Sequence, residues 1–308
     1  MNILFLGGAK RVSLAERLLY AGNKSGFQTK VFSYELDNKV PFTAVGEVII
    51  GKLWNDKDIY IDLKNLIYEK NISIVLANVD PATIVLARLN EKYPELGLIT
   101  SKINTCEIFF DKYIMNKHCI LNEIKTIPFS NDNYPIFMKP RRGSASKGTY
   151  IVNDRVYKDY ILSQIDENQY IFQEYVDGTE YTVDAYISRK GEFIGAVPRI
   201  RTDVTSGEST TATIIDDNEI VEQTKFILLK FDLIGPVTLQ FLRRKNELFF
   251  LELNPRFGGG VIASIKAGFD IPSIMIQDYL GEKIKPLKKY DKLLMTRCYR
   301  EVFHAIDN

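Results

Sequence analysis

One stretch of the chain decides the fold: Leu248-Phe249-Phe250-Leu251-Glu252-Leu253-Asn254-Pro255-Arg256-Phe257-Gly258-Gly259-Gly260. It is typical of a strand that runs into a glycine-rich loop. Successive side chains of a strand point to opposite faces, so one face is expected to carry Leu248, Phe250, Glu252 and Asn254. Pro255 ends the strand, because it cannot donate a ladder hydrogen bond. A carboxylate and an amide therefore share a face just before Arg256 and a run of glycines that lets a ligand approach the backbone.

The preceding apolar run, residues 237–242, predicts an antiparallel hairpin that turns at Lys245-Asn246. This hairpin pairs Gln240 with Glu252 and Leu242 with Phe250. Directly opposite side chains have Cβ atoms about 5 Å apart, so Gln240, Glu252 and Asn254 are expected to form one oxygen cluster. Such a cluster suits Mg²⁺, which takes oxygen ligands and shares them with phosphates. A polar, solvated sheet face is the structural alternative, and the Asn-Pro-Arg-Phe-Gly-Gly-Gly ending favours the metal.

Composition excludes several classes of partner. The chain has 308 residues, of which 45% are hydrophobic and 26% charged, and a formal net charge of +1. That charge provides no electrostatic basis for binding nucleic acid or a membrane surface. No apolar run has the length of a membrane span. The odd set of Cys106, Cys119 and Cys298 lacks metal-ligand spacing, which indicates reduced thiols and a cytoplasmic location.

The first 105 residues alternate strand-like and helix-like segments, which predicts a doubly wound parallel sheet. Gly7-Gly8 follows the first strand but lacks the full dinucleotide fingerprint. A tight turn is therefore favoured over a nicotinamide site, and a nicotinamide-dependent oxidoreductase has no other support. The turn's amides could still bind a carboxylate substrate. Residues 78–80 follow a later strand, where such sheets bind ligands.

The middle of the chain predicts a phosphate-binding loop. Lys139 lies on the strand 136–140, and the glycine- and serine-rich residues 141–148 follow it. Such a loop can fold over phosphates and offer its amides, and a lysine just before it supplies a point charge. An exposed hairpin loop is the structural alternative. Residues 104–121 are expected to form one helix, and residues 203–209 a polar, mobile loop.

Together these motifs resemble the ATP-grasp superfamily, and in particular one half of the carbamoyl phosphate synthetase large chain. The resemblance extends from Ser101 to Phe303, and five segments carry it: Asp111-Lys112, Met138-Lys139-Pro140 with its loop, residues 173–180, Leu239-Gln240-Phe241 and residues 252–256. It implies an α/β and α+β fold, in which a Rossmann-like pre-ATP-grasp domain precedes a two-lobed ATP-grasp fold with antiparallel sheets. The expected boundaries are 1–105, 106–178 (small lobe with connecting helices) and 179–308 (large lobe and C-terminal tail).

The resemblance also implies roles for individual residues. The expected ATP-binding residues are Lys112, Lys139, Gly143, Ser144, Ser146, Gly148, Glu174, Tyr175, Val176, Glu180 and Gln240. The expected ligands of Mg²⁺, or of Mn²⁺ in its place, are Gln240, Glu252 and Asn254. The implied catalytic residues are Arg256, Lys139 and Asn254. Substrate contacts are expected from Arg199, Arg201, Gly258 and Gly259.

The implied activity is an ATP-dependent carboxylate–amine or carboxylate–thiol ligase that forms an acyl phosphate and releases ADP and phosphate. Its partners would be small-molecule carboxylates and amines, and a homodimer is compatible with the family. Many members carry an acidic residue where Gln240 stands. A neutral amide attracts Mg²⁺ less than a carboxylate does, so one metal site is expected to be weaker in this chain. The chain has one ATP-grasp unit, so carbamoyl phosphate synthesis by it alone is not expected. The alternative is a catalytically silent ATP-binding subunit of a larger synthetase.

Overall fold

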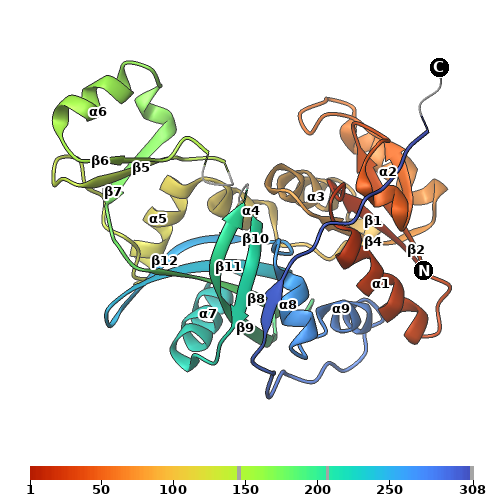
Figure 1. Cartoon of the computed structure of the whole chain (residues 1–308). Coiled ribbons are helices and arrows are strands. Elements are labelled where there is room, and N and C mark those ends of the chain that lie inside the picture. Colours follow the sequence, from red (N-terminus) through yellow and green to blue (C-terminus); the bar gives the residue numbers. More distant parts are fainter. Residues whose placement is uncertain (144–146, 206–207, 306–308) are drawn as a thin grey trace.

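The computed structural model describes residues 1–143, 147–205 and 208–305, and arranges their strands in three sheets (Figure 1). The strands are β1 (Asn2–Leu6), β2 (Lys30–Glu35), β3 (Glu47–Ile50), β4 (Ile72–Ala77), β5 (Ile136–Pro140), β6 (Tyr150–Val152), β7 (Tyr170–Glu174), β8 (Thr179–Ile187), β9 (Phe193–Thr205), β10 (Glu208–Ile214), β11 (Gly235–Arg244), β12 (Glu247–Asn254) and β13 (Leu294–Thr296). The helices are α1 (Val12–Lys24), α2 (Ile59–Glu69), α3 (Asp80–Lys92), α4 (Ile103–Phe110), α5 (Lys112–Leu121), α6 (Arg155–Leu162), α7 (Asn218–Lys230), α8 (Val261–Lys266) and α9 (Ile271–Tyr279).

The N-terminal sheet is parallel, with strand order β3-β2-β1-β4. The strand β1 is buried on both faces, which explains its continuous apolar sequence. Leu4 and Leu6 pack with the buried side chains of α2 and α3, whereas Ile3 and Phe5 pack with those of α1. The expected doubly wound parallel sheet is confirmed.

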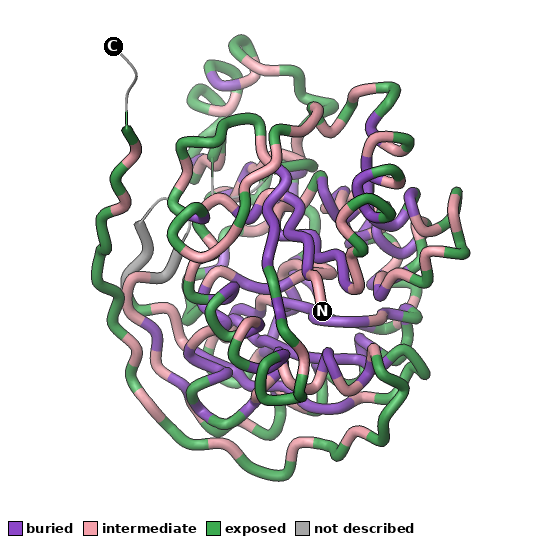
Figure 2. Tube along the Cα trace, turned by 90° about the vertical axis from the view of Figure 1, so that its right-hand side faces the viewer, coloured by how far each residue is buried: buried purple, intermediate pink, exposed green. Residues whose placement is uncertain are grey.

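A six-stranded sheet, with order β12-β11-β8-β9-β10-β13, forms the centre of the molecule, and its neighbouring strands run antiparallel. A smaller sheet, with order β6-β5-β7, forms a separate lobe with α6 (Figure 1). The mixed α/β fold with one parallel and two antiparallel sheets agrees with the expected fold class. Buried residues run through the middle of each unit, and exposed residues follow the rims and the C-terminal tail (Figure 2).

The β11–β12 hairpin confirms one expected pair and corrects the other. Gln240 pairs with Glu252 as expected, and Arg244 pairs with Glu247 around the Lys245-Asn246 turn. The register then shifts between Gln240 and Phe241, so Leu242 pairs with Phe249 and the expected pairing with Phe250 is wrong. A bulge places one extra residue in β12, which interrupts the strict alternation of faces.

The bulge reassigns apolar side chains. Phe250 packs in the core beneath the sheet together with Leu253, whereas Phe249 and Leu251 pack with Val176 on the other side. The expected sharing of a face by Phe250 and Glu252 is therefore wrong. Adjacent residues Leu251 and Glu252 instead line the same pocket.

Two further expectations are corrected. The segment 104–121 forms two helices, because Asp111 has extended dihedral angles and caps α5 by accepting from the amides of Tyr113 and Ile114. The segment 203–209, expected to be a loop, belongs largely to β9 and β10, in which Glu208 pairs with Thr205. The long antiparallel pairing of these strands outweighs the local polarity of the sequence. In the described ranges, no helix has both the length and the hydropathy of a membrane span.

Candidate active site

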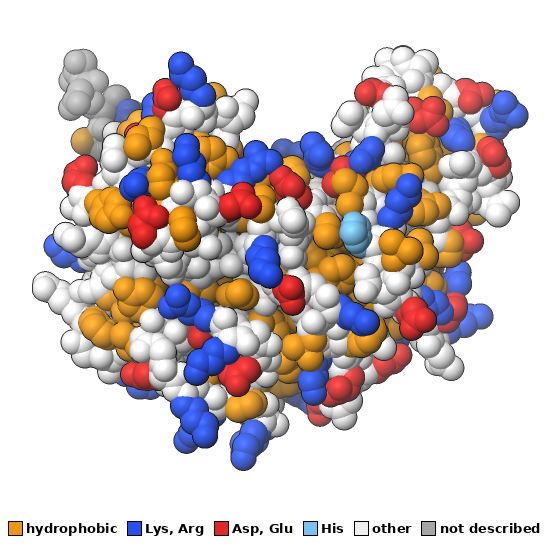
Figure 3. Space-filling model, turned by 180° about the vertical axis from the view of Figure 1, so that it is seen from behind, with side chains coloured by type: hydrophobic (Ala, Val, Ile, Leu, Met, Phe, Trp, Pro, Cys, Tyr) orange, Lys and Arg blue, Asp and Glu red, His pale blue; other side chains and the backbone are white. Residues whose placement is uncertain are grey.

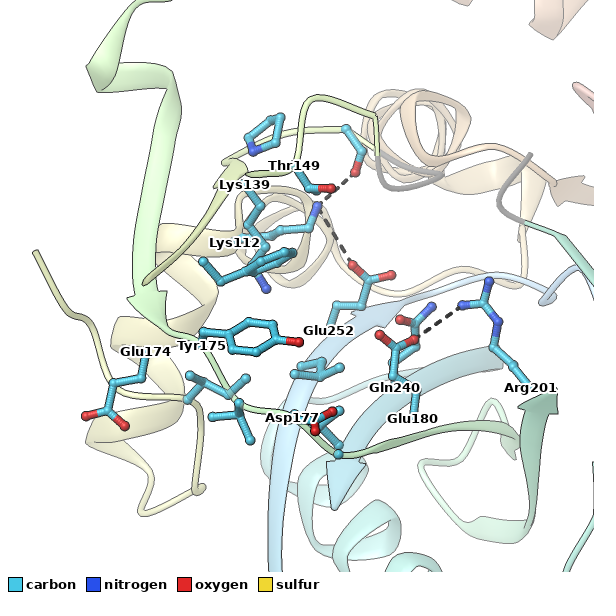
Figure 4. Close-up of a pocket in the computed structure, with 18 of the residues that line it drawn as sticks. Lys112, Lys139, Thr149, Glu174, Tyr175, Asp177, Glu180, Arg201, Gln240 and Glu252 are labelled. Atoms are coloured by element: carbon cyan, nitrogen blue, oxygen red, sulfur yellow. Dashed lines mark hydrogen bonds and ion pairs between the residues drawn. The ribbon is translucent and has the colours of Figure 1, made fainter. Parts of the chain in front are cut away.

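A pocket of about 300 Å³ lies between the small lobe and the six-stranded sheet. We call it the inter-sheet pocket (Figure 4). The residues that line it come from α5, β5, β7, β8, β9, β11 and β12 and from connecting segments: Lys112, Ile127, Phe137, Lys139, Pro140, Gly143, Lys147, Thr149, Glu174, Tyr175, Val176, Asp177, Gly178, Glu180, Arg201, Gln240, Leu242, Leu251 and Glu252. Segments that are far apart in the sequence thus meet at one cavity.

Two lysines enter this pocket from the small-lobe side. The Nζ atom of Lys112 donates to the carbonyl of Gly143 at 2.8 Å and lies 3.8 Å from a carboxylate oxygen of Glu252 (Figure 4). Burial lowers the pKa of Lys139 to about 8, and the nearby charge of Lys112 also lowers it, although Glu252 and Glu180 act in the opposite direction. A buried, incompletely compensated ammonium group of this kind favours an anionic ligand.

The predicted oxygen cluster is partly assembled. Gln240 and Glu252 are cross-strand partners, and both line the inter-sheet pocket. The side-chain amide of Asn254 donates to Glu252 at 3.2 Å, but Asn254 does not line the pocket. Among the described residues, no group of three or more His, Cys, Asp or Glu side chains could hold a metal ion. The donor set of one carboxylate and amide oxygens fits a hard cation only when a ligand such as a phosphate completes the coordination.

The segment that connects β7 to β8 forms one wall of the pocket. Glu174, Tyr175 and Val176 all line it, and Figure 4 shows the Glu174 carboxylate pointing away from the other labelled side chains. Glu174 therefore lines the cavity through its backbone and not through its carboxylate. Glu180, at the start of β8, lies 3.9 Å from the guanidinium of Arg201.

Sequence reasoning missed the apolar part of this pocket, which consists of Ile127, Phe137, Leu242 and Leu251. The alternating pattern of the strand 136–140 could have indicated Phe137, which lies two residues before Lys139 and therefore shares its face of the strand. Nothing in the sequence indicated Leu251, because the bulge brings it to this face. Lys147, which belongs to the expected loop, and Thr149, which directly follows it, also line the pocket.

Other predicted site residues lie outside the pocket lining. Gly148, Gly258 and Gly259 do not line it, and Ser144 and Ser146 lie outside the described residues. Arg199 is buried and donates through Nε to Asp184 at 3.1 Å, and Ser264 donates to the same carboxylate oxygen at 2.7 Å. Arg199 therefore lies in a buried cluster, whereas Arg201 lines the inter-sheet pocket, and the expected substrate contacts of both residues stay a prediction.

The glycine loop after β12 rests on this buried cluster. A Cβ atom added to Gly258 would lie 2.7 Å from Asp184 Oδ1, and one added to Gly260 would lie 2.6 Å from Arg199 Cζ. Both positions therefore need glycine because of close approach to charged side chains. Close packing against Asp184 and Arg199 therefore explains two of the three glycines in this loop, Gly258 and Gly260.

Arg256 contacts the N-terminal unit. Its guanidinium pairs with Asp80 at the start of α3, with distances of 2.5 and 2.6 Å from Nη2 and Nε to one carboxylate oxygen. Asp80 directly follows Asn78 and Val79 at the end of β4. The ion pair thus connects the strand-end loop of the parallel sheet to the loop that follows β12.

The Gly7-Gly8 turn is occupied by side chains of this chain. Ser33 Oγ accepts from the amide of Gly8 at 3.2 Å, and the Glu35 carboxylate bonds to the amides of Gly8 and Ala9. The expectation that a substrate carboxylate could use these amides is therefore corrected, because an internal carboxylate uses them. The same occupancy gives no support to a nicotinamide site.

Charges of both signs are interspersed over the face shown in Figure 3, which agrees with the small net charge. The outline is notched between the small lobe and the N-terminal unit (Figure 3).

Comparisons with known proteins agree with this architecture. Residues 166–299 match the family model described as "ATP-grasp in the biosynthetic pathway with Ter operon". The carbamoyl phosphate synthase large chain of Clostridium beijerinckii is 28% identical over 244 residues, which are 74% of this chain and 21% of that protein. The D-alanine–D-alanine ligase of Petrotoga mobilis is 35% identical over 106 residues, 30% of this chain and 34% of that ligase. The chain spans about a fifth of the length of the carbamoyl phosphate synthase large chains.

Solved structures show the same fold. The N5-carboxyaminoimidazole synthetase of Staphylococcus aureus, complexed with ADP, has a TM-score of 0.77 at 17% identity and covers 96% of this chain and 82% of its own. The biotin carboxylase domain of the Hydrogenobacter thermophilus 2-oxoglutarate carboxylase, in complex with MgADP, ADP and bicarbonate, has a TM-score of 0.73 at 14% identity, with 94% and 72% coverage. These matches confirm the resemblance to ATP-grasp ligases and to the carbamoyl phosphate synthase large chain.

Proposed function

We propose that this chain, which has the ATP-grasp fold and resembles ATP-grasp ligases, uses ATP to activate a carboxylate as an acyl phosphate. An amine or a thiol then displaces the phosphate. One observation carries the proposal: the inter-sheet pocket gathers Lys112, Lys139 and the Gln240–Glu252 pair around one cavity. Cations beside a carboxylate and an amide are the groups that a magnesium-bound polyphosphate requires.

The pocket offers separate surfaces for each part of ATP. The apolar side chains of Ile127, Phe137, Leu242 and Leu251 would contact the adenine faces, and the backbone of residues 174–176 would bind the adenine edge. Glu180 would accept from the ribose hydroxyl groups. Lys112 and Lys139 would then hold the phosphates. The lowered pKa of Lys139 supports this assignment, because a bound phosphate compensates a buried ammonium group.

A divalent cation fits the donor set at the phosphate end of the pocket. Glu252 would supply the negative charge and Gln240 an amide oxygen, while Asn254 orients Glu252 through its hydrogen bond. When bound with ATP, the cation would neutralise charge on the phosphates. A neutral amide at position 240 attracts a cation less than a carboxylate would, so we assign the main role to Glu252.

The reaction needs positioning and charge neutralisation more than acid–base groups. A carboxylate oxygen of the substrate forms a bond to the γ-phosphorus, and the bond from that phosphorus to the ADP oxygen breaks. The nitrogen of the amine then forms a bond to the acyl carbon, phosphate leaves with the electrons of the C–O bond, and the amine loses a proton to water. In this scheme Lys112 and Lys139 hold ATP, the phosphoryl donor, and Arg256 stabilises the phosphoryl group during its transfer.

A silent ATP-binding subunit is the second candidate, and two observations favour it. Arg256 is paired with Asp80 and does not line the inter-sheet pocket, and Gln240 replaces an acidic residue found in many ATP-grasp proteins. The two candidates differ in one measurement. A ligase releases ADP in a carboxylate-dependent reaction, whereas a silent subunit binds ATP without this release.

The test is an ADP-release screen across carboxylates, with hydroxylamine present as a nucleophile that traps acyl phosphates as hydroxamates. Carboxylate-dependent ADP and hydroxamate formation would support the ligase. ATP binding without any carboxylate-dependent release across the panel would favour the silent subunit.

Glu252→Gln provides a sharper prediction for the metal role. The change removes the main negative charge of the site, so metal-dependent turnover should fall by at least about 100-fold, which corresponds to roughly 3 kcal/mol in the transition state. The matched control is Glu247→Gln, which alters an exposed residue at the turn of the same hairpin. Turnover at limiting Mg²⁺ that equals that of the unsubstituted enzyme would refute the assignment.

A further inference from the structure

A second cavity, of about 410 Å³, lies at the carboxyl ends of β1, β2 and β4 in the N-terminal unit. We call it the N-terminal cavity. None of its lining residues lines the inter-sheet pocket. Its walls combine hydrogen-bond acceptors, cations and apolar side chains.

One partly buried carboxyl, that of Glu35, and one amide oxygen without a hydrogen-bond partner in the described part of the chain, that of Asn78, line this cavity. Burial raises the pKa of the Glu35 carboxyl, although hydrogen bonds from Ser33 and from the amides of Ala9 and Gly8 act to lower it. Asn78 is 2% exposed, and its Nδ2 donates to the carbonyl of Leu76 at 3.1 Å. The Oδ1 atom of Asn78 has no hydrogen-bond partner among the described residues. A buried acceptor without a partner costs free energy, and a ligand N–H group would supply the donor.

Three cations border the same cavity: Lys10, Arg11 and Lys52. The side chains of Lys10 and Lys52 form no ion pair with any described residue. Arg11 donates to the backbone carbonyls of Asn78 at 3.4 Å and of Gly258 at 3.3 Å. Arg11 therefore spans from the N-terminal cavity to the glycine loop after β12.

Apolar side chains complete the walls. Trp54, Val40 and Val79 line the cavity, and Leu36, which is 61% exposed, lies among its lining residues. An exposed leucine at the edge of a partly apolar cavity extends the surface that an apolar group can contact. A ligand with an apolar body, a donor group and an anionic group matches all three kinds of wall.

We propose that the N-terminal cavity binds an α-amino acid with an apolar side chain. Its ammonium group donates to Glu35 and Asn78, its side chain packs against Trp54, and its carboxylate faces the cations Arg11 and Lys52. Arg11 reaches the glycine loop, and Asp80, two residues after Asn78, pairs with Arg256. The carboxylate end thus lies toward the residues that the proposed function assigns to phosphoryl transfer.

Under the proposed function, this amino acid is the carboxylate that ATP activates. Only this role of the ligand rests on the proposed function. Binding itself is independent of catalysis and can be measured without ATP.

The experiment is calorimetry on the full chain without nucleotide, with leucine and phenylalanine as probes. The comparison ligands are 4-methylpentanoate, which lacks the amine of leucine, and 3-methylbutylamine, which lacks its carboxylate. We expect leucine or phenylalanine to bind, and each truncated compound to bind at least about tenfold more weakly, because a hydrogen bond to a charged group is lost.

Variants locate the site. Lys52→Glu reverses a charge at the cavity and should weaken leucine binding by at least about tenfold. Lys57→Glu makes the same change at an exposed residue outside the cavity and should leave binding unchanged. Glu35→Gln should weaken binding and also the preference for the amine, and its circular dichroism and thermal unfolding report whether the turn stays folded.

The outcomes separate the two proposals. Absence of binding by both amino acids, equal binding of 4-methylpentanoate, or equal loss in the Lys52→Glu and Lys57→Glu variants would overturn the assignment of this cavity. Amino-acid binding that depends on Lys52 and on the amine would support it, even if no ADP were released. ADP release with other carboxylates, without amino-acid binding, would retain the ligase and reject this ligand.

Discussion

Lys139 is the residue whose environment has the most direct kinetic consequence. Burial lowers its pKa to about 8, so the side chain is charged below this pH and neutral above it. If Lys139 binds the phosphates, kcat/KM for ATP should be level below pH 8 and fall above it, because kcat/KM reports the free enzyme. The measurement is a pH profile of ADP release.

Two variants control this interpretation. Lys139→Ala should raise the KM for ATP and abolish the fall of kcat/KM above pH 8. Lys139→Arg retains a charge at all these pH values, so its profile should extend level to higher pH. If kcat/KM for ATP still falls above pH 8 in Lys139→Ala, the group that titrates is not Lys139.

Arg256 and Asp80 provide a prediction about positioning. If Arg256 acts in the transition state, Arg256→Ala should lower kcat by on the order of 10³-fold, with a smaller change in KM. Asp80→Asn removes the carboxylate charge that holds the guanidinium and should lower kcat by about tenfold at unchanged KM for ATP.

The double variant decides whether the two residues act together. Because Asp80 would act only through Arg256, Asp80→Asn should add nothing to Arg256→Ala. Additive losses, or variants that change only KM, would contradict the assigned roles.

At the scale of elements, the break between α4 and α5 depends on Asp111. Its carboxylate accepts from two amides of α5 and pairs with Arg141 at 2.8 Å. Burial acts to raise the pKa of Asp111, but the hydrogen bonds from Arg141, Ile114 and Tyr113 outweigh it and lower the pKa below its usual value. The cap thereby fixes the first residue of α5, Lys112, at the inter-sheet pocket.

We therefore expect Asp111→Ala to lower the free energy of unfolding by about 2–3 kcal/mol, through loss of the cap and of a charged hydrogen bond. Asp154→Ala, which removes the cap of α6 alone, should cost about 1 kcal/mol. The measurement is chemical denaturation, and equal effects of both variants would contradict the role of Arg141.

The same cap has a defined pH dependence. A carboxyl whose folded-state pKa is below its unfolded value contributes stability above the unfolded pKa, near 4, and loses it as pH falls through the folded pKa. The difference in the free energy of unfolding between the unsubstituted chain and Asp111→Ala should therefore become smaller below about pH 4.

At the scale of the whole molecule, the N-terminal unit shares a core with the C-terminal helices. Leu18 of α1 belongs to one buried cluster that also contains Val261, Ile265 and Met275 from α8 and α9. The boundary at residue 105 that the sequence predicts thus divides units that bury apolar surface against each other.

A fragment of residues 1–105 would expose this apolar surface. We expect the fragment to bind a hydrophobic dye and to lack a cooperative thermal transition, whereas the full chain unfolds cooperatively. Circular dichroism with dye fluorescence is the measurement. A fragment with a sharp transition of its own would show that the shared core is not required.

Local patterns predicted much of this protein. The alternation of strands and helices predicted the parallel sheet, and the hairpin turn at Lys245-Asn246 predicted the pairing of Gln240 with Glu252. Lys112 and Lys139 were expected beside one ligand, and both line the inter-sheet pocket. These features depend on chain periodicity and on turn geometry, which neighbouring residues determine.

The tertiary structure alone decided the bulge in β12, the pairing of Arg199 with Asp184 and of Arg256 with Asp80, and the occupancy of the glycine turn by Glu35. Arg256 and Asp80 are 176 residues apart in the sequence. Periodicity tells which face a side chain occupies, but a buried or partly buried charge takes whichever partner packing brings to it, since leaving it unpaired is costly.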